Sequence, residues 1–444
     1  MAENYVPLGT IQLTQNAASV TFDNIPQSGY TDLKIVASIR TDGASANNYG
    51  YLDIAFNGST ANYSARRILG YATAVNSGSG TVFLTPQNTN AATSNTFSNM
   101  EITIPNYTSS NYKSISVDGV TENNSTAAES AFCTLEAGLW SSTSAITSLG
   151  FSVRSGYGSS ILANSTFSLY GIAALGTTPT VAPKATGGNI VGNDGTYWYH
   201  SFLSSGTFTP QTSLTADYLV VAGGGGGGFD AGGGGGAGGY RYFTSQSFSA
   251  TAYTVTVGAG GAGATTTVRG SNGSTSTFNS ISSSGGGGGG SDGVATGNSG
   301  GSGGGGRANG NAGGSGNAGS YSPVEGYAGG NAANPGAGGG GGGSSAVGQN
   351  STTTTNGGNG GAATSNSITG SAVNYAGGGG GAVNQSTGGG AGADASGAGT
   401  GGTNVRGAGT AATANLGGGG GGGGAGLSGG AGGSGIVIIR YPMA

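Results

Sequence analysis

Runs of consecutive glycine fill the second half of this chain and restrict what it can fold into. Glycine is unfavourable in helices and strands because it loses the most backbone entropy on ordering and has no side chain to pack. The region must therefore be either a flexible linker or an ordered structure built from backbone alone. The runs are 223–228, 232–236, 285–290, 303–306, 338–343, 377–381, 388–390 and 417–424.

Two apolar segments at the ends of this region favour order over a flexible linker. The first, YLVVA at 218–222, runs directly into six glycines, and the second, IVIIRY at 436–441, closes the region. These segments can pair with each other and with the strand-like stretches 252–257 and 276–281. A flexible linker would leave such apolar segments exposed to water. The similar lengths of the runs and the aromatic residues between them also favour an ordered domain.

The ordered structure that glycine runs favour is polyglycine II. This extended left-handed helix has three residues per turn and rises about 3.1 Å per residue, so a six-residue run spans about 19 Å. It has no internal hydrogen bonds, and its backbone groups point outward to neighbouring helices. A Cβ would hold those neighbours apart, as it would in collagen, so glycine must occupy the inward positions. The sequence therefore predicts a stacked lattice of such helices with few short strands.

The first half has a different pattern and predicts an antiparallel β-sandwich. Short runs alternate between apolar and polar residues, as in 100–104, where Met100, Ile102 and Ile104 share one face. Period-two alternation between polar turns is typical of half-buried antiparallel strands. About ten such runs indicate a jelly-roll-like sandwich over 1–175, followed by a linker over 176–198 and the glycine-rich domain over 199–444. The predicted fold class is therefore all-β.

The glycine-rich half resembles the glycine-rich domains of bacteriophage fibre proteins. The resemblance is carried by DYLVVAGGGGGG at 217–228, GGSGIVIIRY at 432–441 and HSFLSSGTFTP at 200–210. The region is similar to the adhesin at the tip of T-even-like phage tail fibres, whose polyglycine II sandwich displays host-recognition loops. The N-terminal half differs from the attachment module of that adhesin. The resemblance implies a virion protein, made in the host cytoplasm without a signal peptide.

The segments between glycine runs are then expected to be loops that contact a host receptor, the longest being 307–337 and 344–376. Tyrosine and phenylalanine provide rigid contacts, while Asn, Ser and Gly provide adaptable hydrogen bonds. Because long and short segments do not alternate regularly, the sequence assigns none of them to one end of the lattice. The candidate receptor-binding residues are Phe229, Arg307, Tyr321, Tyr327, Tyr375, Asn384 and Asn404.

Composition argues against several partners and cofactors. Only 6% of the residues are charged and the formal net charge is −4, so a nucleic-acid partner, which would need clustered Lys and Arg, is not expected. No apolar stretch is long enough to predict insertion into a membrane, and the start of the chain does not resemble a signal peptide. The one cysteine, Cys133, is expected to be a small buried residue of a strand. No metal site and no cofactor are predicted.

No catalytic motif stands in a supporting context. The one histidine, His200, lies in a strand-like stretch, and the G-x-G-x-x-G at 258–263 has no following helix to bind a pyrophosphate. We therefore expect a protein without enzyme activity: a receptor-binding fibre protein that forms a homotrimer and contacts other virion proteins and a host surface protein or glycan. One alternative is a capsid or tail decoration protein that binds no receptor. A minor alternative is a polysaccharide depolymerase that uses two carboxylates.

Overall fold

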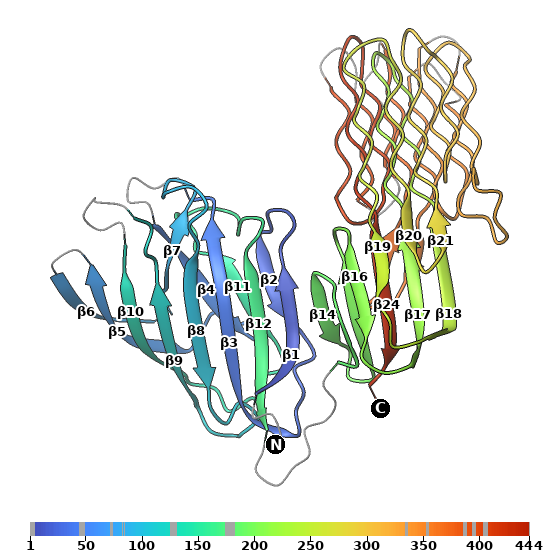
Figure 1. Cartoon of the computed structure of the whole chain (residues 1–444). Helices are drawn as coiled ribbons and strands as arrows, with labels where there is room; N and C mark the ends of the chain where they lie inside the picture. Colours follow the sequence, from blue (N-terminus) through green and yellow to red (C-terminus); the bar gives the residue numbers. More distant parts are fainter. Residues whose placement is uncertain are drawn as a thin grey trace. The chain divides into compact units, whose positions relative to one another are not determined.

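The computed structural model (Figure 1) describes residues 5–43, 49–71, 74–81, 83, 85–124, 131–173, 183–333, 336–351, 355–384, 389–392, 397–402 and 407–443. This part of the chain contains strands and extended segments and no α-helix, so the predicted all-β class is confirmed. It divides into two compact units. One comprises the described residues up to Lys184 with Asn189–Trp198 and Met443, and the other comprises Ala185–Gly188 and Tyr199–Pro442.

The first unit is a two-layer β-sandwich. Its strands are β1 (Tyr5–Gln12), β2 (Ser19–Phe22), β3 (Tyr30–Thr41), β4 (Tyr49–Phe56), β5 (Tyr63–Tyr71), β6 (Ala74–Gly80), β7 (Thr85–Thr89), β8 (Ser98–Ile104), β9 (Lys113–Val120), β10 (Cys133–Trp140), β11 (Leu149–Val153), β12 (Thr166–Ala173) and β14 (Ile190–Asn193). One layer has the order β6-β5-β10-β9-β8-β3-β12-β1-β14, with antiparallel neighbours throughout. The other layer has the order β7-β4-β11-β2, and a short parallel pairing joins β7 to β3.

Alternating apolar side chains from both layers form the core of the sandwich. Met100, Ile102 and Ile104 of β8 are fully buried, as their shared face in the sequence predicts. Across the core, β4 contributes Ile54 and Phe56, and the ring of Phe56 lies near that of Trp140. Burial of this kind stabilises the folded state by about 25 cal/mol for each Å² of apolar surface removed from water.

The second unit contains a set of mostly short strands spread along its sequence. They are β13 (Ala185–Thr186), β15 (Tyr197–Phe202), which starts in the first unit, β16 (Gly206–Pro210), β17 (Leu214–Val221), β18 (Tyr240–Phe248), β19 (Tyr253–Thr256), β20 (Ser276–Phe278), β21 (Ile281–Ser283), β22 (Thr364–Asn366), β23 (Val373–Tyr375) and β24 (Ile436–Pro442). The two apolar end segments pair directly, because β17 and β24 are antiparallel with Tyr218 opposite Ile439. The predicted pairing of the two end segments with each other is confirmed. The stretches 252–257 and 276–281, which were also expected to pair with them, contain β19 and β20, and these two strands pair with each other.

Beyond these strands the glycine runs form the predicted polyglycine II lattice (Figure 1). Along 223–228 the backbone N–H groups bond to three different neighbours in turn, and each neighbour recurs every third residue. Gly223 and Gly226 donate to Ser274 and Ser271, Gly224 and Gly227 to Gly433 and Gly430, and Gly225 and Gly228 to Gly236 and Gly233. This period of three is that of a helix with three residues per turn. The lattice therefore satisfies its buried backbone groups without a conventional sheet.

Glycine is required inside the lattice because neighbouring backbones are in direct contact. A Cβ placed on Gly224 would lie 2.0 Å from the carbonyl oxygen of Gly418, and the other glycines of the same run would meet backbone at similar distances. The inner helices are therefore nearly pure glycine. Helices on the outside keep glycine where the backbone faces a neighbouring helix and carry side chains at the outward position of each turn. In 257–264, for example, Gly258 and Gly261 are buried while Ala259 and Ala262 are exposed.

Three sequence expectations are corrected by the structure. The segments 307–337 and 344–376 are not single long loops, because much of each forms further lattice helices, among them 311–316, 326–332 and 357–363. The signal was present as glycine at every third position. Cys133, expected to be buried, is exposed because it points away from the core at the start of β10. Part of the segment 176–198, expected to be a linker, forms β13, β14 and the start of β15.

Candidate functional site

The glycine helices have two distinct ends. We call the end at which the glycine helices continue into the strands β17 to β21 the base, and the opposite end the tip. The chain leaves β17 along 222–228, turns at 229–231 and returns along 232–239 to β18, so the turn 229–231 lies at the tip (Figure 1). The same reasoning places 265–269 there, between the helix after β19 and the helix before β20. Hydrogen bonds and ion pairs to these turns add 291–294, 307–310 and 425–427 to the tip.

Arg307 is the centre of an ionic clamp at the tip. Its Nη2 lies 2.7 Å from Asp230 Oδ2 and 2.8 Å from Asp292 Oδ1, and its Nε donates to the carbonyl oxygen of Asp230. The other carboxylate oxygen of Asp230 accepts the N–H of Gly426 at 2.7 Å. The Arg307 side chain is only 11% exposed, so these bonds are partly shielded from solvent. The clamp joins four separate turns into one surface.

The tip also exposes aliphatic side chains that the sequence did not single out. Val268 is 60% exposed and Val294 is 42% exposed, and their turns are adjacent because Gly293 N–H donates to the carbonyl oxygen of Thr267. Phe229 is half-buried beside them, and its N–H donates to the Ser291 hydroxyl. The only sequence signal for these valines was their isolation within polar turns. Exposed apolar side chains held on a clamped surface are typical of a protein contact.

Three of the predicted site residues lie at or near the base instead. Tyr375 is 2% exposed and packs in a core cluster with Leu219 and Ile438. Tyr321 is half-buried, with the guanidinium of Arg241 3.8 Å from its ring centroid. Tyr327 is 38% exposed near the start of an outer helix. The structure therefore separates these tyrosines from Phe229 and Arg307, and it gives Tyr375 a role in packing.

The remaining two predicted residues are asparagines of later turns. Asn384 is half-buried, and its N–H donates to the carbonyl oxygen of Gly336. Asn384 follows Val383, a buried residue at the end of the glycine helix that begins at 376. Asn404 lies outside the residues that the structure describes. Of the seven predicted residues, Phe229 and Arg307 are the two that the structure brings together at the clamped part of the tip.

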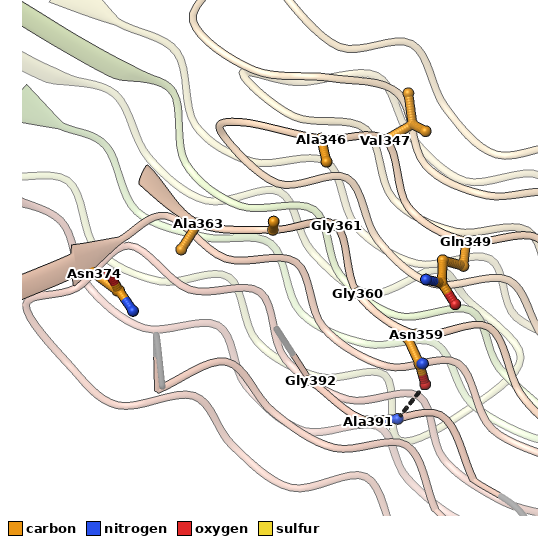
Figure 2. Close-up of a pocket in the computed structure, with 11 residues that line it drawn as sticks. Ala346, Val347, Gln349, Asn359, Gly360, Gly361, Ala363, Asn374, Ala391 and Gly392 are labelled. Atoms are coloured by element: carbon orange, nitrogen blue, oxygen red, sulfur yellow. Dashed lines mark hydrogen bonds between the residues drawn. The ribbon is translucent and has the colours of Figure 1, made fainter. Parts of the chain in front are cut away.

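A pocket opens on the flank of the lattice, next to β23, which contributes Asn374 to its lining (Figure 2). The flank pocket has a volume of about 400 Å³, within the range of small-molecule sites. Figure 2 shows the amide of Asn374 toward one end and those of Gln349 and Asn359 toward the other. None of its lining residues within the described ranges is ionisable. The lining consists of Ala346, Val347, Gln349, residues 359–363, Asn374 and residues 391–392.

The one histidine is a structural residue. His200 is fully buried in β15, with Nδ1 2.6 Å from the carbonyl oxygen of Gly187 and Nε2 2.9 Å from the hydroxyl of Tyr441. A neutral ring that donates from Nδ1 and accepts at Nε2 satisfies both contacts. Burial lowers the pKa of His200 to about 4, so the ring is neutral near pH 7. His200 is therefore closed off from any substrate.

The described part of the chain also places no three His, Cys, Asp or Glu side chains where they could bind a metal ion. Within the same ranges, no helix has the length and apolar character needed to cross a membrane.

These observations define a class of protein: a polyglycine II lattice that begins and ends on paired apolar strands and carries its turns at two ends. A family model described as a glycine-rich domain matches residues 203–442, and the chain belongs to this family. The match covers the lattice together with β16 to β24. A search of the curated proteins finds no match to the sequence.

Proposed function

We propose that this protein is a bacteriophage virion fibre protein that binds a host receptor through the tip of its glycine lattice. The observation that supports the proposal is the clamp of Arg307, Asp230 and Asp292, which fixes several turns on a rigid backbone scaffold. A binding surface held in place before contact loses little entropy on association. The resemblance of the glycine-rich half to phage tail-fibre adhesins supports the same function.

The receptor in this proposal is a host outer-membrane protein or a surface glycan. Val268, Val294 and Phe229 would supply apolar contact, and the half-exposed carboxylate of Asp292 would supply polar contact at the rim. A protein receptor is favoured because the exposed side chains of these turns are aliphatic, and aliphatic contacts are typical of the desolvated centre of a protein interface. The protein would act without catalysis, cofactor or metal.

The sandwich would attach the protein to other virion proteins. Its outer face carries the apolar side chains of Ile68 and Leu135, which are opposite each other on β5 and β10 and are both about half exposed. Such a pair is costly to leave in water and suits an assembly contact. We include a homotrimer in the proposal, with this face as its contact. Sedimentation of the purified chain, compared with an Ile68→Ser/Leu135→Ser variant, tests the oligomeric state.

The experiment for receptor binding uses labelled protein and the bacterial host on which the virion propagates. Replacing Val268 and Val294 by serine should abolish saturable binding, since it removes apolar contact area without touching the clamp. The matched control is Tyr327→Ser, a comparable loss of exposed area near the base. Equal binding by wild type and the double variant would contradict the proposal.

Two other functions predict different results in the same material. A decoration protein without a receptor would show no saturable binding to host cells, and virions lacking residues 203–442 would adsorb normally. A depolymerase would release reducing sugar from host polysaccharide, and substitution of its carboxylates would stop that release. Locating the chain in a virion reconstruction distinguishes a tail fibre from a capsid surface.

A further inference from the structure

The flank pocket lies where the described part of the lattice lacks neighbouring helices. A helix with three residues per turn directs its N–H groups three ways and its C=O groups three ways, so it can bond to six neighbours. Among the described residues, the helix 357–363 bonds to four. The N–H groups of Gly358 and Gly361 donate to the helix 338–343, and their carbonyl oxygens accept from the helix 376–382. The carbonyl oxygen of Asn359 accepts from the helix 346–351, and the N–H of Gly360 donates to the helix 389–392. The two remaining directions face outward.

The outward residues of this helix exclude a further polyglycine neighbour. Inside the lattice, helices are so close that a Cβ on Gly358 would lie 2.0 Å from the carbonyl oxygen of Gln349. Asn359 and Ala362 carry Cβ atoms on the exposed side, three residues apart. A glycine helix at lattice spacing would meet these atoms in the same way. Any occupant must therefore lie further out and contact side chains.

The side chains that line the pocket combine neutral amides with methyl groups. The Oδ1 of Asn359 accepts the N–H of Ala391 at 2.9 Å, which fixes the amide and leaves its NH₂ group as a donor (Figure 2). Gln349 and Asn374 add two more amides, and Val347, 57% exposed, adds an aliphatic surface. Without a charge in the described lining, the pocket offers nothing to neutralise an acidic ligand.

We propose that the flank pocket binds a neutral saccharide of one or two rings. Sugar hydroxyls both donate and accept, which matches amide groups, while the C–H faces of a sugar ring suit Ala and Val methyl groups. The pocket volume of about 400 Å³ is that of a small-ligand site. This site is separate from the tip and does not depend on the function proposed for it.

The test is saturation-transfer NMR on the full chain with methyl glycosides of neutral hexoses and N-acetylhexosamines, and with methyl glucuronide as the charged comparison. We expect saturable binding of at least one neutral glycoside in the millimolar range, as is usual for ligands of this size. Ala362→Trp fills the pocket from an exposed position and should abolish binding. Gln349→Ala/Asn374→Ala should weaken binding by about tenfold or more, because two hydrogen bonds are lost.

The matched control is Gln246→Ala, which removes an exposed amide of β18 outside the pocket. It should leave binding unchanged, and an unchanged melting temperature in all variants confirms that each one folds. The proposal is overturned if no neutral glycoside of the panel binds, if binding survives Ala362→Trp, or if the glucuronide binds equally well. Loss of host-cell binding in the tip variant, with glycoside binding retained, would separate the two sites.

Discussion

The backbone of Gly227 touches that of Gly421 so closely that a Cβ on Gly227 would lie 1.9 Å from the Gly421 carbonyl oxygen. The N–H of Gly227 meanwhile donates to a third helix, at Gly430 O. Contact on several sides leaves no direction in which the backbone could relax. The stability of the glycine-rich unit therefore depends on the absence of side chains, where most domains depend on their presence.

Gly227→Ala is expected to destabilise the glycine-rich unit severely. The added methyl group overlaps backbone that other helices hold in place, and we expect a loss of about 3 kcal/mol or more in the free energy of unfolding. Thermal and urea unfolding measure this loss. Gly206→Ala in β16 is the control, because its Cβ would be 3.4 Å from the Phe202 ring, an ordinary contact. Equal stability of the two variants would contradict the lattice.

Outward positions of the outer helices should tolerate change. Ala262 is exposed, while Gly261 beside it would place a Cβ 2.1 Å from the carbonyl oxygen of Ser271. We expect Ala262→Ser to change the free energy of unfolding by less than about 0.5 kcal/mol and Gly261→Ala to lower it by several times that amount. Chemical denaturation of the pair measures the contrast. Similar effects at both sites would mean that inward and outward positions are not distinct.

Amide hydrogen exchange should be slow throughout the inner helices. Within 285–290 and 417–424, the N–H groups of residues 286, 287, 289, 290, 417 and 419–424 are buried and bonded to neighbouring segments, so they can exchange only when the lattice opens. Protection comparable to that of β17 and β24 is expected by mass spectrometry. Exchange at random-coil rates in these two segments would show that the glycine runs are unstructured.

Arg307→Ala is expected to loosen the tip without unfolding the lattice. It breaks the ion pairs with Asp230 and Asp292, which are partly buried, at a cost of about 2 kcal/mol. Hydrogen exchange should accelerate at 229–231 and 291–294 while 285–290 stays protected. Arg307→Lys keeps the charge but has a single donor group in place of the guanidinium fork, so its effect should be smaller and in the same turns. A uniform loss of protection would contradict a local clamp.

Stability should fall in mild acid because of His200. Burial lowers its pKa to about 4 in the folded state, against about 6.5 in the unfolded chain, so the unfolded state binds more protons between these values. The contribution of the neutral His200 ring to the free energy of unfolding is fully present above pH 6.5. It is lost as the pH falls to 4, by about 3 kcal/mol in total. His200→Gln, which keeps a donor and an acceptor, should flatten this part of the pH profile. An unchanged profile in that variant would exclude His200 as the cause.

The sequence predicted the lattice because its signals are local. Consecutive glycines can be ordered only by backbone contact, and the two apolar segments that pair as β17 and β24 stand out at 218–222 and 436–441. The sandwich was predicted for the same reason, since period-two alternation specifies a buried face wherever the strand pairs. The outer helices were not predicted because their glycines are interrupted by other residues, and only the recurrence of glycine every third residue, as at Gly358 and Gly361, marks them.

By itself, then, the sequence determined that the second half is a lattice of bare backbone closed by two apolar strands. The tertiary structure alone decided which turns reach the tip, and that Arg307 meets Asp230 there while Tyr375 is buried at the base. The physical reason is that one glycine helix is chemically the same as another. Only long-range hydrogen bonds between them assign each helix its direction and neighbours, and these bonds place every turn and every side chain the turns carry.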